Sequence, residues 1–289
     1  MGALLNTDQS GFTLELLSHR TLETCGTQQV YSNMQSKSAN THSYTAQFLI
    51  TASGELKAPL FLILPEKGGN FGPRVASTMF RHPELHVVSS TSGKITKPLL
   101  KDWFKNVFFP NVPSDSVLLL DSLTTYKDRA EIDAEKPHDK NYSTITIPGG
   151  LTGQTQPLDV YFNRPYKAFL RRISDFINYY CETTIKLHLR DTILKLQTLT
   201  HNQFRSPRFK GFIKHAWEKS GLIAENELSN NSYRFEDPND FCFSSDCILR
   251  QSCSSCDNSQ CFIRCAWCKA ILCFKDFYFE FHFCENFIP

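Results

Sequence analysis

Three aspartates occupy positions from which carboxylates could meet at one edge of a sheet. Asp8 ends a short apolar segment, Asp121 ends another, and Asp159 opens a basic helical region. A carboxylate at the end of a strand is held rigidly, and three can hold two Mg²⁺ (or Mn²⁺) ions. Two such ions favour phosphodiester displacement, because they activate a water and stabilise the leaving oxygen. A second interpretation stays open, since an aspartate after a strand is commonly a turn former or a helix N-cap.

The second chemical feature is a cysteine-rich tail. Only Cys25 and Cys181, of eleven cysteines, precede residue 242. Nothing directs the chain to an oxidising compartment, so clustered cysteines point to metal rather than disulfides. The residues with the paired spacing of zinc ligands are Cys253, Cys256, Cys265, Cys268, Cys273, Asp276, His282 and Cys284. One or two Zn²⁺ ions are expected, because about 40 residues make a poor core without such a staple. The alternative is nine free cysteines packed among phenylalanines.

Eight ligands in four pairs suit two tetrahedral zinc ions in a cross-brace, in which alternate pairs share an ion. The first site would then contain Cys253, Cys256, Cys273 and Asp276. The second would contain Cys265, Cys268, His282 and Cys284. This RING-like arrangement also leaves open a ubiquitin-ligase function, which rests on the tail alone.

Composition places the chain among ordinary globular proteins. It has 289 residues, of which 41% are hydrophobic and 21% charged, and a net charge of +2. The longest apolar run, 58–65, is far shorter than the ~18 residues of a membrane span. The start of the chain lacks the features of a secretory signal. We therefore expect no membrane partner.

Hydrophobic periodicity predicts a mixed α/β sheet followed by helices. Strands are expected at 3–6, 44–51, 56–64, 86–89, 117–120 and 143–147, and helices at 98–109, 166–180, 185–199 and 207–219. The turn at 52–55 predicts a β-hairpin. The expected organisation is a catalytic core at 1–165, a basic helical extension at 166–224, a linker at 225–246 and a zinc-binding module at 247–289.

The helical extension is basic. Residues 160–220 hold twelve Lys or Arg against four Asp or Glu, a net charge of +8. Arg164, Lys167, Arg171 and Arg172 would form one face for DNA phosphates. The same pattern also fits a helix face that is merely solvated.

The segments around the aspartates resemble the DDE-type endonuclease domain of the pogo, Tigger and Jerky transposases. The most specific is QPLDV at 156–160, preceded by NTDQSG at 6–11 and LLLDS at 118–122. The resemblance covers about residues 3–220 and implies a ribonuclease-H-like fold. It also implies that Asp8, Asp121 and Asp159 form the metal-binding triad of a DNA endonuclease and strand transferase located in the nucleus.

Two departures from the family pattern bear on activity. Asp121 is followed by Ser-Leu-Thr-Thr-Tyr, where the group commonly has an aromatic residue and then histidine or tyrosine. The chain also starts at the first catalytic strand, without the helix-turn-helix domains expected before it, as in a truncated copy, a fragment or a domesticated remnant. The alternative function is therefore a catalytically idle protein that binds DNA or chromatin.

The tail resembles the small cysteine-rich zinc modules of some transposases, notably the piggyBac type. In those modules histidine usually stands at the position of Asp276, so Cys261 or Cys247 is a substitute ligand. The expected partners are DNA and, through the zinc module, other proteins or a second copy of the chain. No small-molecule substrate is expected.

Overall fold

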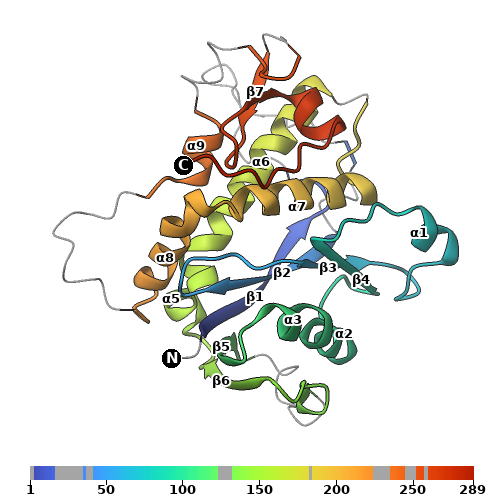
Figure 1. Cartoon of the computed structure of the whole chain (residues 1–289). Helices are drawn as coiled ribbons and strands as arrows, with labels where there is room; N and C mark the ends of the chain where they lie inside the picture. The colour runs from blue at the N-terminus through green and yellow to red at the C-terminus, as the bar shows by residue number, and fades with distance from the viewer. Residues whose placement is uncertain are drawn as a thin grey trace, which may run out of the picture.

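The computed structural model describes residues 3–16, 35–36, 42–122, 132–181, 184–223, 235–244, 252–256 and 260–289. A twisted sheet lies at the centre, with one group of helices on each face (Figure 1). The cysteine-rich tail packs on the outer side of two long helices. Within the described residues, no helix combines the length and apolar character that crossing a bilayer requires.

The sheet has six strands, in the order β4-β3-β2-β1-β5-β6. They are β1 (Ala3–Thr13), β2 (Ser43–Thr51), β3 (Leu60–Pro65), β4 (Leu85–Ser90), β5 (Asp115–Asp121) and β6 (Asn141–Ile147). β2 runs antiparallel to both β1 and β3, whereas β4, β5 and β6 run parallel to β3, β1 and β5 respectively. The predicted mixed α/β sheet and its hairpin are confirmed.

Two predicted strand bounds are wrong. β1 continues to Thr13, so Asp8 lies in the middle of the strand and does not end it. The reason is that β2 pairs with β1 along its whole length, which holds polar residues in a central strand. β3 begins at Leu60 rather than at residue 56, because Pro59 has no N–H for a ladder; Leu56 makes only an isolated bridge.

One face of the sheet is covered by α2 (Lys97–Trp103), the π-helical turn η2 (Phe104–Phe108) and α3 (Phe109–Asn111). These elements together confirm the helix predicted at 98–109. Trp103 and Phe108 are fully buried there against Leu5 of β1 and Leu118 of β5. A short helix α1 (Pro73–Thr78) lies between β3 and β4.

The opposite face is covered by the helices that follow β6. They are α5 (Thr152–Thr155), η4 (Leu158–Phe162), α6 (Asn163–Tyr180), α7 (Arg190–Phe204), η5 (Pro207–Phe209) and α8 (Lys210–Lys219). α7 starts five residues later than predicted, because Leu189 is extended and serves as its N-cap. The range predicted as a linker contains a further helix, α9 (Pro238–Cys242), which packs on α6.

The tail contains β7 (Cys261–Arg264), β8 (Ile271–Cys273) and the turn η6 (Lys275–Phe279). Its aromatic side chains join the core beneath it. The Phe176 ring of α6 lies 4.5 Å from Phe262 and 5.0 Å from Phe274, centroid to centroid. One continuous apolar cluster therefore runs from the sheet through α6 and α7 into the tail. The four-part domain division stays a prediction.

Candidate carboxylate site and cysteine sites

The strand register places two of the three predicted aspartates on the same face of neighbouring strands. In the parallel β1–β5 ladder Asn6 pairs with Leu119, so Asp8 and Asp121 are each two residues further along. Leu119 belongs to the apolar cluster beneath α6, and side chains two residues apart share a face of a strand. Asp8 and Asp121 therefore face the side of the sheet on which α6 lies.

The turn that carries Asp159 is tied to β1 by two buried hydrogen bonds. The Leu158 N–H donates to Asn6 Oδ1 at 3.2 Å, and Gln156 Nε2 donates to the Thr7 carbonyl at 3.4 Å. Asn6 and Gln156 are both fully buried. These contacts hold the QPLD segment against the middle of the strand that carries Asp8.

Asn163 links Asp8 to Asp159. Its Nδ2 lies 3.1 Å from Asp8 Oδ2 and 3.2 Å from Asp159 Oδ1. Loss of water around Asp8, together with the negative charge of Asp159, raises the pKa of Asp8 from 3.8 to about 7. Two acidic groups from distant parts of the chain thus share a site that favours a proton or a cation.

Asp121 makes a different set of contacts. Its Oδ1 accepts the Ser122 N–H at 2.5 Å and the Ser122 hydroxyl at 3.3 Å. Two groups of potential metal ligands have their ligand atoms within 4.8 Å of one another among the described residues. Both of these groups lie in the tail. The three aspartates thus form no such group: Asp8 and Asp159 are bridged, and Asp121 lies beside them on the neighbouring strand.

The four predicted DNA-contacting residues divide into two groups. Lys167 Nζ lies over the Phe12 ring of β1, 5.3 Å from its centroid. Burial lowers the pKa of Lys167, while Asp8 and Asp159 act to raise it and Arg171 to lower it. Arg164 and Arg172 instead line a cavity of about 400 Å³ against α9.

The tail brings together the two sets of ligands that the cross-brace pattern predicts. At the first site, Asp276 Oδ2 lies 2.9 Å from Cys253 Sγ and 3.2 Å from Cys273 Sγ. Cys256 Sγ completes the set, 3.6 Å from Cys273 Sγ. At the second site, Cys265, Cys268, His282 and Cys284 gather, with Cys268 Sγ 3.6 Å from His282 Nε2.

Without an ion, burial favours the neutral thiol of Cys265, Cys273 and Cys284, because it raises the pKa of each. Burial raises the pKa of Cys265 to about 12. Hydrogen bonds from Cys253, Cys256 and Cys273 lower the pKa of Asp276 to about 2. Asp276 is the fourth side chain of the first group. Cys261 lies nearby on β7 but outside the group, and Cys247 lies outside the described residues.

The sequence interpretation missed the polar residues of α7 that hold the second site. Asn202 Nδ2 donates to the Cys284 carbonyl at 3.0 Å, and Gln203 Oε1 accepts the Ala266 N–H at 2.7 Å. Both side chains are fully buried. The signal was the polar run Thr200–Gln203 inside an otherwise apolar helix, which predicts buried hydrogen-bond partners.

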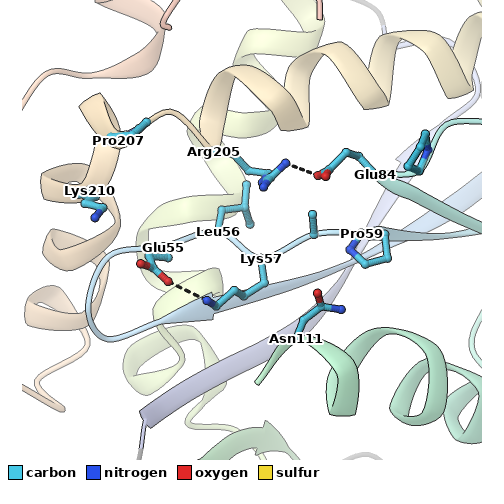
Figure 2. Close-up of a pocket in the computed structure, with 11 residues that line it drawn as sticks. Glu55, Leu56, Lys57, Pro59, Glu84, Asn111, Arg205, Pro207 and Lys210 are labelled. Carbon is cyan, nitrogen blue, oxygen red and sulfur yellow. Dashed lines mark hydrogen bonds and ion pairs between the residues drawn. The ribbon is translucent and has the colours of Figure 1, made fainter. Parts of the chain in front are cut away.

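A separate cavity of about 500 Å³ lies between the β2–β3 hairpin and the α7–α8 turn (Figure 2). Four of its five charged side chains are paired within its own wall, and the fifth is Lys210. Glu55 accepts from Lys57 at 2.7 Å, and Glu84 accepts from Arg205. The cavity lies at the amino ends of β3 and β4, and none of the predicted site residues lines it.

Comparison with protein families gives two adjoining matches. Residues 44–224 match the DDE superfamily endonuclease, a range that includes Asp121 and Asp159 but not Asp8. Residues 217–284 match the Tc5 transposase C-terminal domain, a range that includes every candidate ligand of the tail. No curated protein and no solved structure matches the chain. Since the first match covers more than half of the sequence, the chain belongs to the DDE superfamily of endonucleases and has the ribonuclease-H-like fold of that domain.

Proposed function

We propose that the chain is a transposase domain that cuts DNA and joins the freed end to a second duplex, with Asp8, Asp121 and Asp159 as its metal ligands. The observation that carries this proposal is the bridge from Asp8 through Asn163 to Asp159. It joins a sheet strand to the family's QPLD segment, beside the strand end that presents Asp121.

The donor set fits Mg²⁺ or Mn²⁺. All three side chains offer oxygen, the ligand that these hard cations prefer. The raised pKa of Asp8 indicates a partly buried site where loss of water and the charge of Asp159 favour binding of a proton or a cation. Lys167 is a nearby cation, since Asp8 and Asp159 both act to raise its pKa. When bound, a pair of ions supplies charge neutralisation, water activation and stabilisation of the leaving oxygen.

The proposed reaction has two balanced steps. In cleavage, a water oxygen bonds to phosphorus and the bond to the 3′ oxygen breaks; the water loses a proton and the leaving oxygen gains one. In joining, the freed 3′ oxygen attacks a phosphorus of a second duplex, whose own 3′ oxygen leaves as a hydroxyl. The protein's part is to hold three carboxylates and the DNA backbone in fixed positions.

The basic groups around α6 give two separate contacts for DNA. Lys167 and Arg171 would meet the phosphate nearest the carboxylates, and Arg164 and Arg172 a phosphate on the α9 side. Each phosphate contact releases counterions, so DNA affinity should fall steeply as salt rises. Such a protein would act in the nucleus.

For the tail we propose two Zn²⁺ ions, with a Cys₃Asp and a Cys₃His ligand set. Thiolate and imidazole ligands in four-membered groups are typical of structural zinc. The ligand atoms of each set already lie within 4.8 Å of one another without an ion, which supports this proposal. The module would also offer a surface for another protein or a second copy of the chain.

The decisive experiment uses the full chain loaded with zinc. Mn²⁺ binding, measured by paramagnetic resonance, and Mn²⁺-dependent nicking of supercoiled plasmid are compared for wild type, Asp121→Asn and Asp115→Asn. Asp115 is the matched control, since it lies at the opposite, exposed end of β5. We expect Asp121→Asn to lose Mn²⁺ binding and nicking while keeping its DNA affinity, and Asp115→Asn to retain all three.

The same experiment separates the alternative function. A wild-type chain that binds plasmid DNA but neither binds Mn²⁺ nor nicks it is a catalytically idle DNA-binding protein. Loss of DNA affinity in Asp121→Asn would instead show that the substitution damages the fold.

A further inference from the structure

Asn163 occupies the place between two carboxylates where a cation would be expected. It is the first residue of α6, and its Nδ2 donates to Asp8 Oδ2 at 3.1 Å and to Asp159 Oδ1 at 3.2 Å. Two neighbouring carboxylates repel each other unless positive charge or a donor lies between them, and Asp159 accordingly raises the pKa of Asp8. The amide nitrogen therefore does part of what a metal ion would do.

The other end of the same amide is unsatisfied. Asn163 Oδ1 is buried and has no hydrogen-bond partner among the residues described. Leaving such an oxygen unpaired costs roughly 1–3 kcal/mol, and buried groups of this kind call for an explanation. The hydrogen bonds of Nδ2 set the present orientation of the amide.

The two ends of an asparagine amide exchange places by a half-turn about the last side-chain bond. In the absence of a cation, that rotation would put a third oxygen beside Asp8 and Asp159, which is unfavourable. With a divalent cation there, amide oxygen is a suitable ligand. The orientation of Asn163 is thus the one expected for a metal-free site.

We propose that Asn163 is a fourth metal-ligand residue of the carboxylate site. Its NH₂ group stands in for the cation in the metal-free chain, and its oxygen becomes a ligand when the cation binds. This inference rests on the proposed Asp8, Asp121 and Asp159 site and adds a neutral ligand to it.

The test measures binding of Mn²⁺ alone to the zinc-loaded full chain, by paramagnetic resonance titration. Asn163→Ala should bind Mn²⁺ at least fivefold more weakly than wild type. Asn163→Asp, which is nearly isosteric, should bind at least tenfold more tightly. The metal-free Asn163→Asp chain should also melt at a lower temperature, with Mn²⁺ restoring it, since three carboxylates then face one another.

A matched control lies on the same helix. Asn178 of α6 also has a buried Oδ1 that finds no hydrogen-bond partner in the described part of the chain, but it lies far along the helix from Asn163. Asn178→Ala should leave Mn²⁺ affinity unchanged. Circular dichroism of all three variants verifies that each is folded.

A purely structural role for Asn163 predicts the opposite sign. If its amide only competes with the ion for Asp8 and Asp159, Asn163→Ala would bind Mn²⁺ as tightly as wild type or more tightly, and the inference falls. If Asp8→Asn abolishes Mn²⁺ binding while the Asn163 variants bind normally, the proposed function stands without this ligand. If the wild-type chain binds no Mn²⁺, both proposals fall.

Discussion

The tail and the carboxylate site differ in how far each is assembled without a metal. In the tail, two sets of four ligand side chains each gather within 4.8 Å, whereas the three aspartates do not. Burial raises the pKa of Cys265 to about 12 and also raises the pKa of Cys273 and Cys284, so these neutral thiols can approach their neighbours without repulsion. Carboxylates repel each other when both are charged, and the nearby Asp159 helps raise the pKa of Asp8 to about 7 although Asn163 bridges the two. Charge in the absence of metal therefore decides which site is assembled in advance.

The largest expected effect is loss of the second cysteine site. Cys265→Ser should lower the free energy of unfolding of the whole chain by several kcal/mol, because the tail shares one apolar cluster with α6 and α7. Urea unfolding followed by tryptophan fluorescence and far-UV circular dichroism measures this. The control is Cys181→Ser, a cysteine outside both ligand groups. A variant in which the tail melts separately and the core keeps its stability would contradict a shared core.

The next effect concerns the unusual ligand of the first site. Asp276→His should raise zinc affinity at that site more than tenfold, about 1.4 kcal/mol, because Cys₃His is a common structural zinc set. Asp276→Asn, which removes the charge but keeps the shape, should lower it. Competition with a chelating dye measures both. Equal affinities for aspartate and histidine would show that the ligand type at this position has little weight.

The buried polar residues of α7 test whether the core positions the tail ligands. Asn202→Ala removes a hydrogen bond to the Cys284 carbonyl and another from the Cys284 N–H, at 3.0 and 3.5 Å. Loss of such a supporting contact costs about tenfold in metal affinity. Zinc release from the second site should therefore speed up while the first site is unaffected. Faster release from both sites would indicate general destabilisation.

The two sites also differ in how much the sequence could predict. The tail pairs lie within 32 residues, so spacing alone indicated both the ligands and their pairing, which the structure brings together. The family resemblance, more than spacing, points to Asp8, Asp121 and Asp159, since an aspartate after an apolar run has many ordinary explanations. The polar neighbours of Asp8 are typical of a turn, so the pattern predicts that Asp8 ends a strand. Pairing with β2 keeps these polar residues in strand β1, and the local sequence of β1 gives no sign of that pairing.

The residues that support the sites were harder to predict than the ligands. Asn6, Asn163 and Asn202 each make a hydrogen bond to a residue more than eighty positions away in sequence. Nothing in the local pattern distinguishes an asparagine that bridges two carboxylates from one on a helix surface. By contrast, the α6 pattern agrees with the fold because burial on one face of a helix leaves a periodic trace in its sequence. The strands at 44–51 and 117–120 agree because burial on both faces leaves a short, nearly continuous apolar run.

The smallest effect tests the charge argument itself, in the zinc-loaded chain without Mg²⁺ or Mn²⁺. The pKa of Asp8 rises from 3.8 to about 7 on folding, so between these values the folded chain keeps a proton that the unfolded chain has lost. The contribution of Asp8 to the free energy of unfolding therefore falls as pH rises from about 4 to 7. Above pH 7 Asp8 is ionised in both states, and the destabilisation no longer grows. Asn cannot ionise, so Asp8→Asn should gain about 1 kcal/mol relative to wild type between pH 6 and pH 8. Urea unfolding at the two pH values measures the gain, with the exposed Asp115→Asn as a control that should show none. If Asp8→Asn follows the wild-type pH dependence, then repulsion between carboxylates does not explain why this site is less assembled without metal than the cysteine sites. The remaining explanation would be that its three aspartates come from elements far apart in the sequence.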